Sequence, residues 1–139
     1  MIEPGATERQ ADRADTAARA QIVTLDHVQL AMPVGGEPAA RAFYTDLLGL
    51  SEIEKPLPLR ARGGCWFHLG DRQLHLGVDP DFRPARKAHP AVVVADLVRL
   101  RSHLEAANVK TADDEPLNGV ERFFADDPFG NRLEFLARD

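Results

Sequence analysis

The stretch HVQLAM at residues 27–32 returns in altered form as HPAVVV at residues 89–94. In each copy a histidine is followed by large apolar residues three and five positions later, which are Leu30 and Met32 in the first copy. Side chains alternate between the two faces of a strand, so the histidine and these apolar residues lie on opposite faces. The repeat therefore predicts two equivalent strands, each with one face for the core and a histidine on the other.

The segments after these two strands also repeat, in the order helix and then three strands. The helices are predicted from apolar residues at helical spacing, after Pro38 in the first copy and after the N-cap Asp96 in the second. The predicted strands are 22–32, 51–56, 64–70 and 72–78 in the first copy, and 89–95, 109–113, 119–125 and 131–137 in the second. We predict an α+β fold of two tandem βαβββ modules, module one at 22–78 and module two at 89–137, joined by a connector at 79–88 in one domain at 21–138.

Composition limits the class of protein. The chain has 139 residues with 44% hydrophobic and 28% charged residues, which is typical of one globular domain. The net charge of -5 gives no support for binding nucleic acid, and no apolar run is long enough to span a membrane. Cys65 is the single cysteine, so a disulfide within the chain is excluded and a cytoplasmic location is expected. Residues 1–20 are polar and alanine-rich, and we interpret them as a mobile tail.

Four side chains at equivalent positions of the two modules are candidate metal ligands. His27 and His89 are equivalent in the first strands, and Leu74-His75-Leu76 aligns with Leu133-Glu134-Phe135, which makes His75 and Glu134 equivalent in the last strands. If the modules pair with these faces inward, three imidazoles and a carboxylate converge in one cleft. Such a set suits a divalent ion such as Zn, Ni, Co, Mn or Fe.

Four further residues are candidates for contact with a substrate. A two-residue turn at Gly70-Asp71 pairs Trp66 with His75 and places His68 on the same face, so both would flank the site. Arg122 and Phe124 share a face of their strand and are candidates for the lining of the cleft. The longer turn at 126–131 leaves the direction of these two side chains open.

The sequence resembles the vicinal oxygen chelate superfamily, which includes glyoxalase I, bleomycin and fosfomycin resistance proteins and extradiol dioxygenases. The resemblance is carried by DHVQLAMP at 26–33, ARAFYTDLLGL at 40–50, HPAVVVADL at 89–97 and DPFGNRLEFL at 127–136. It implies a curved mixed sheet around a central cleft, a homodimer, and metal ligands at His27, His75, His89 and Glu134. Members similar to glyoxalase I commonly have glutamate at the position of His75, which is a departure in this chain.

Three functions are the resulting hypotheses. The first is a metal-dependent, glyoxalase-like lyase or isomerase for a small oxygen-rich substrate, in which Glu134 or His75 serves as the catalytic general base. The second is an Fe(II) extradiol-type dioxygenase with His27, His89 and Glu134 as its two-histidine, one-carboxylate set. The third is a metal-free protein of the bleomycin-resistance type that binds a small molecule without turnover. The modules can pair either within one chain or across a dimer.

Overall fold

The structure is a computed structural model that describes residues 20–138. Module one contains β1 (His27–Met32), α2 (Glu37–Arg41), the π-helix η1 (Ala42–Leu47), β2 (Glu52–Ile53), α3 (Leu57–Arg60), β3 (Cys65–Leu69) and β4 (Arg72–Val78). Module two contains β5 (Ala91–Val94), α4 (Leu97–Ala106), β6 (Thr111–Asp113), β7 (Arg122–Asp126) and β8 (Arg132–Ala137). The predicted duplication of strand, helix and three strands is therefore confirmed.

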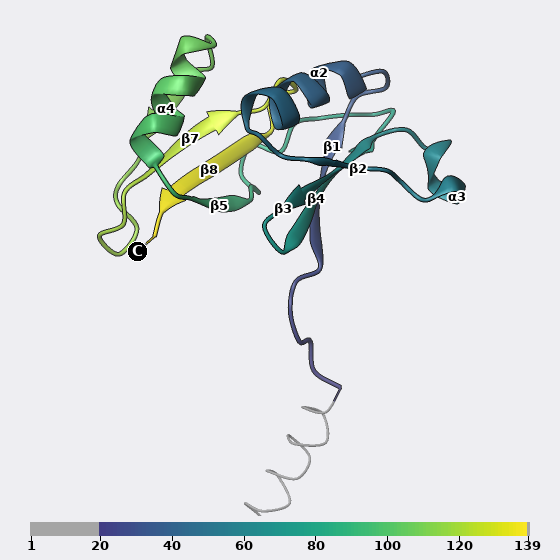
Figure 1. The fold of residues 1–139 in the computed structure, drawn as a ribbon, viewed down its shortest axis with the longest axis horizontal. Helices are drawn as coiled ribbons and strands as arrows, with labels where there is room; N and C mark the ends of the chain where they lie inside the picture. Colours follow the sequence, from purple (N-terminus) through teal and green to yellow (C-terminus); the bar gives the residue numbers. More distant parts are fainter. Residues whose placement is uncertain (1–19, 139) are drawn as a thin grey trace, which may run out of the picture.

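Each module forms its own four-stranded mixed sheet. The strand orders are β1-β4-β3-β2 and β5-β8-β7-β6, with parallel pairing only between the first and last strand of each module. The modules lie side by side, with α2 and α4 on the same side of the two sheets (Figure 1). Because the second module repeats the strand order of the first, equivalent residues of the two modules occupy equivalent places in their sheets.

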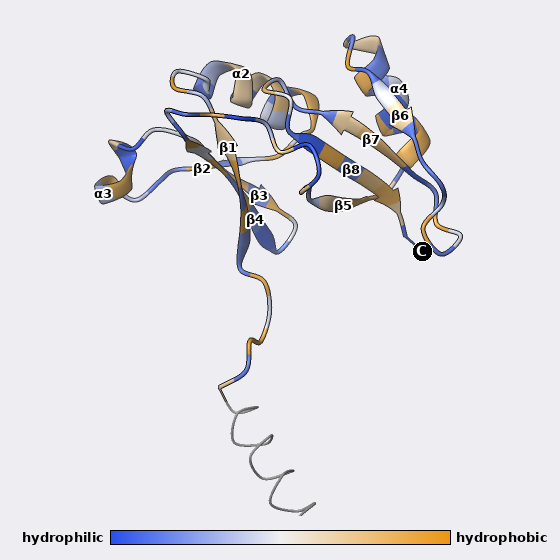
Figure 2. Ribbon diagram, turned by 180° about the vertical axis from the view of Figure 1, so that it is seen from behind, coloured by the Kyte–Doolittle hydropathy of each residue, from blue (hydrophilic) through white to orange (hydrophobic). Residues whose placement is uncertain are grey.

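The core lies on the helix side of both sheets. Large buried side chains there include Phe67, Leu76 and Phe123, while the apolar residues that follow the two repeated histidines also pack into this cluster. Apolar stretches run along the strands beneath the helices when the molecule is seen from behind (Figure 2). Because side chains alternate along a strand, each of the two histidines lies on the opposite face of its sheet, together with the residues two and four positions after it.

The first strand is shorter than predicted, since pairing begins at His27 rather than at residue 22. His27 pairs with Gln73, and β4 begins one residue earlier, directly after the Gly70-Asp71 turn. Residues before His27 consequently have no strand beside them, and Ile22 and Val23 are 95% and 93% exposed. The predicted mobile tail at 1–20 lies almost wholly outside the described residues. Within residues 20–138 no helix has the length and apolar character to cross a membrane.

The two modules are joined through a buried polar network around Asp127. Tyr44 in η1 donates a hydrogen bond from its hydroxyl to Asp127 Oδ2 at 2.7 Å, and Asn131 donates to the same oxygen at 2.9 Å. Asn131 also donates from Nδ2 to the carbonyl of Ala31 in β1, at 2.8 Å. Burial and the neighbouring carboxylate raise the pKa of Tyr44, so its hydroxyl keeps the proton that it donates. The turn before β8 thus ties module two to module one.

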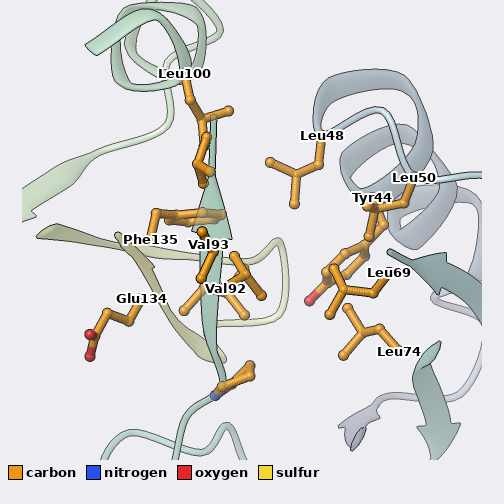
Figure 3. Close-up of a pocket in the computed structure, with 13 residues that line it drawn as sticks. Tyr44, Leu48, Leu50, Leu69, Leu74, Val92, Val93, Leu100, Glu134 and Phe135 are labelled. Carbon is orange, nitrogen blue, oxygen red and sulfur yellow. The ribbon is translucent and has the colours of Figure 1, made fainter. Parts of the chain in front are cut away.

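An apolar cavity of about 150 Å³ lies at the seam between the modules. Tyr44, Leu48 and Leu69 face Val92 and Phe135 across it (Figure 3). The carboxylate of Glu134 points away from these side chains in the same view. The seam is therefore apolar on the helix side, and the acidic group of β8 belongs to the other face of the sheet.

Candidate metal centre

In module one, three aromatic rings form a stack on the sheet face opposite the helix. Trp66 lies parallel to His75 with ring centroids 4.0 Å apart, and His27 covers the other side of His75 at 4.2 Å. The predicted hairpin register, with Trp66 opposite His75, is confirmed. His75 is only 4% exposed as a result. Burial, followed by the nearby His27, lowers the pKa of His75, which favours a neutral imidazole at neutral pH.

In module two, His89 and Glu134 meet on the corresponding face. His89 Nε2 lies 2.9 Å from Glu134 Oε1, and Arg122 contacts the same oxygen at 3.2 Å. Glu134 is 4% exposed, so its carboxylate is largely shielded from solvent and contacts these two side chains. The candidate ligands occupy equivalent positions in the two modules. Each module contributes one residue at or just before its first strand and one residue in its last strand.

Each of the three imidazoles has one ring nitrogen beside an oxygen of the protein. His27 Nδ1 lies 2.9 Å from Asp26 Oδ2, His75 Nε2 lies 2.8 Å from Gln73 Oε1, and His89 Nδ1 lies 2.8 Å from the carbonyl of Lys87. A hydrogen bond donated by that nitrogen to the oxygen leaves the lone pair of a neutral ring on the other nitrogen. Such outer partners are typical of metal-binding histidines. In His89 the other nitrogen is Nε2, which lies beside Glu134 Oε1. The donor set therefore fits a divalent ion.

The four candidate ligands do not gather at one point of the described chain. They form two pairs, His27 with His75 and His89 with Glu134, and residues 20–138 contain no group of three or more side chains of ligand type that could hold an ion. A single copy thus presents two half-sets. Two ligands from one pair fill only part of the coordination sphere of a metal ion, so other groups must supply the remaining ligands.

The residues predicted to contact substrate lie on the same faces as these pairs. Trp66 is half-buried against His75, and His68 is exposed beside Gln73. Phe124 pairs with Glu134 across β7 and β8 and contacts His89 edge to face at 5.3 Å, which settles the direction that the sequence left open. Arg122 shares this face, although its guanidinium is engaged by Glu134 and by Asp114 at 3.4 Å.

Sequence reasoning missed two neighbours of these residues. Arg132 stacks on Phe124, with its guanidinium carbon 3.8 Å from the ring centroid. Gln73 holds a nitrogen of His75. Both lie two residues from a predicted site residue within a strand, and the period of two places them on the same face. That period was the available signal, but a lone arginine or glutamine in a strand is more often a solvated residue.

Known proteins share the family and the fold of this chain. A sequence model of the Glyoxalase/Bleomycin resistance protein/Dioxygenase superfamily matches residues 24–135, and the chain belongs to this superfamily. A solved glyoxalase family protein from Bacillus anthracis is 44% identical, with a TM-score of 0.82 over 86% of this chain and 98% of that chain. No curated protein matches the chain.

Two more distant structures share the fold alone. A genomically encoded fosfomycin resistance protein from Listeria monocytogenes is 14% identical, with a TM-score of 0.69 over 86% of this chain and 96% of that one. Lactoylglutathione lyase from Agrobacterium tumefaciens is 20% identical, with a TM-score of 0.63 over 84% of this chain and 95% of that one. These matches confirm the two-module α+β fold.

Proposed function

We propose that the protein is a divalent-metal-dependent enzyme of the glyoxalase type, and that two copies of the chain complete its site. His27 and His75 of one copy would hold the ion together with His89 and Glu134 of a second copy. The pairs support this arrangement because they are complementary half-sets at equivalent positions of two modules that have the same strand order. A homodimer with facing sheet surfaces would bring four ligands to each ion.

The chemistry depends on the groups around that position. A bound divalent ion supplies stabilisation of negative charge on a substrate oxygen. Glu134 is the candidate general base once its carboxylate has left the ion: it would then accept the proton as a C–H bond next to a substrate carbonyl breaks, and return it to a neighbouring atom. Arg122 and His89 both contact Oε1 and orient the carboxylate for this task. Trp66 and Phe124 offer aromatic walls for the remainder of a small, oxygen-rich substrate.

The single observation that carries the proposal is the contact between His89 and Glu134, with the other nitrogen of His89 held by the carbonyl of Lys87. Elemental analysis of protein loaded with Zn, Ni, Co, Mn or Fe tests it. Wild type should retain about one ion per chain, as expected for two shared sites in a dimer. His27→Ala and His89→Ala should each lose most of it, whereas the exposed His103→Ala serves as a matched control and should not.

An Fe(II) dioxygenase is the second candidate, and one feature of His75 favours it. Both faces of this ring are covered by stacked aromatic rings, so a set made only of His27, His89 and Glu134 would leave His75 as a wall of the site. His75→Gln separates the two candidates. Iron retention with oxygen consumption on catechols supports the dioxygenase, and loss of the metal supports the four-ligand site.

Metal-free binding of a small molecule is the result that would contradict both enzymes. Such a protein would retain none of the five ions after loading and dialysis, and the histidine variants would resemble wild type. The same experiment therefore tests the proposed metal dependence and its main competitor.

A further inference from the structure

A second cavity lies on the His75 side of module one, between the strands and the segment that carries α3. Its volume is about 150 Å³, and its walls include Gln29, Lys55, Arg62, Trp66 and Val78. Unlike the cavity at the module seam, this one is bordered by two basic side chains and an amide. Two of its lining residues adjoin His75: Trp66 stacks on that imidazole, and Gln29 is the partner of His75 in the pairing of β1 with β4.

The two basic side chains have no carboxylate partner within the described part of the chain. Neighbouring basic residues do: Arg41 pairs with Glu52 at 2.8 Å, and Arg60 contacts Glu54. Lys55 donates a hydrogen bond to the carbonyl of Gly63, which holds its ammonium group beside the cavity. That carbonyl is neutral, so the positive charge of Lys55 is not cancelled.

Glu37 is the acidic group that approaches this region, and the backbone engages it. Its Oε1 accepts a hydrogen bond from the amide of Gly64 at 3.0 Å, the main reason for the lowered pKa of Glu37. Lys55 and Arg62 therefore keep a net positive charge at the cavity even with this carboxylate counted. One lysine and one arginine against one glutamate leave an excess of a single cation.

Glycines make the close approach of these walls possible. A Cβ at Gly77 would come within 2.5 Å of Gln29 Nε2, so the absence of a side chain there lets the Gln29 amide lie across β4. A Cβ at Gly64 would come within 2.2 Å of the carbonyl of Leu76, and both Gly63 and Gly64 have positive φ. The chain turns sharply at this pair, directly after Arg62, and returns to the sheet. The cavity is thus a product of local backbone geometry.

We propose that this cavity binds an anionic group of the substrate, a carboxylate or a phosphate, through Lys55 and Arg62, with Gln29 as a further donor. The guanidinium of Arg62 can present two parallel N–H groups to either oxyanion, and Lys55 adds a point charge. This inference rests on the proposed function. If the protein is such an enzyme, its substrate is a small acid or a phosphate ester, and the remainder of that substrate extends past Trp66 toward His75.

Trp66 is the only tryptophan of the chain, so its fluorescence reports directly on this cavity. Chelator-treated full-length protein is titrated with inorganic phosphate and, separately, with propionate, at constant ionic strength, with glycerol as an uncharged control. We expect a saturable change with at least one anion and none with glycerol. The anion that binds more tightly identifies the group. A signal that does not saturate with either anion would overturn the proposal.

Two variants and a control variant locate the response. Arg62→Gln and Lys55→Gln should each weaken binding by about fivefold or more, whereas Lys110→Gln removes a charge from module two and should leave it unchanged. Arg62 is exposed, so its variant keeps the fold even if Lys55→Gln is disturbed by loss of the contact with Gly63. Equal binding by wild type and Arg62→Gln would contradict the proposal.

The outcome is separable from that of the metal site. His27→Ala should lose metal yet keep the phosphate or propionate response, while Arg62→Gln should keep its metal and lose the response. If the chain binds no metal but Trp66 still reports saturable, Arg62-dependent binding, the proposed enzyme fails and the anion site stands. If metal binds and the anion response is absent, the reverse holds.

Discussion

His89 Nε2 lies 2.9 Å from Glu134 Oε1, although the two residues are 45 positions apart in the sequence. The contact depends on the parallel pairing of β5 with β8, in which Ala91 faces Glu134, and on the loop that brings His89 to the edge of the sheet. The same parallel pairing in module one places His27 near His75. Each half of the proposed metal site is therefore a consequence of one parallel strand pair.

Replacing Glu134 tests the carboxylate of this pair. Glu134→Gln keeps the shape of the side chain but removes its charge, so we expect metal affinity to fall by roughly tenfold or more. Titration with a competing chelator measures the change. Glu121→Gln is the matched control, because Glu121 is exposed and lies in the same module. Equal affinity of Glu134→Gln and wild type would exclude this carboxylate as a ligand.

The burial of His75 predicts a pH dependence of stability in the metal-free protein. Its pKa is lowered in the folded state, chiefly by burial and then by His27, so the unfolded chain takes up the proton more readily. The free energy of unfolding should fall as the pH decreases below about 6.5, the ordinary histidine value. The lowered pKa values of Glu37 and Asp113 act only at more acidic pH. Denaturant unfolding between pH 7.5 and 5.5 measures the slope.

His75→Gln is the control for that slope. The variant lacks the titrating ring and should show a smaller loss of stability over the same pH range than wild type. An unchanged slope in His75→Gln would assign the pH dependence to other groups.

The hydrogen bond between Tyr44 and Asp127 joins the two modules, so we expect its loss to lower the free energy of unfolding. Tyr44→Phe leaves the ring in place and removes one donor to a buried carboxylate, so stability should decrease by about 1–3 kcal/mol. Thr45→Val is the control from the next position. The Thr45 hydroxyl is buried and has no partner within residues 20–138, so its loss should not destabilise the protein. Urea unfolding of both variants gives the comparison, and equal stability of the two would contradict this account.

A side chain at Gly64 is expected to destabilise the protein by a steric clash with the backbone. A Cβ there meets the carbonyl of Leu76 at 2.2 Å, in addition to the strain of a positive φ, whereas Gly35 has the same sign of φ and open space around it. Gly35→Ala should cost about 1–2 kcal/mol, and Gly64→Ala should cost clearly more and weaken the anion response of Trp66. The unfolding midpoints measure the difference. A smaller effect at Gly64 than at Gly35 would refute the close approach.

Much of the fold was predictable because its signals are local. The two-residue turn at Gly70-Asp71 fixed the hairpin, and the offset of apolar residues from His27 and His89 identified equivalent strands. Asp96 is the N-cap of α4 as predicted, accepting a hydrogen bond from the amide of Arg99 at 3.0 Å. The expected homodimer and cytoplasmic location stay predictions.

Other features depend on contacts that no local sequence pattern predicts. Asp127 stabilises a turn next to it, but its bond to Tyr44 spans 83 positions and arises only when the modules meet. Lys55 lies at the end of the predicted strand 51–56, and Arg62 lies between two predicted strands. Their approach to Gln29 depends on the positive φ of the Gly63-Gly64 pair. Likewise, the separation of the four candidate ligands into two half-sets that do not meet within one chain depends on how the modules are placed, which local periodicity does not encode.

Complementation between two inactive variants tests the shared metal site most directly. His27→Ala lacks a ligand in module one and Glu134→Ala lacks one in module two, so neither should hold metal alone. A mixed dimer, isolated with two different affinity tags after joint refolding, should contain one intact site. The account predicts about one ion per mixed dimer and almost none in either parent. A mixed dimer with no more metal than its parents would contradict a site built from two copies of the chain.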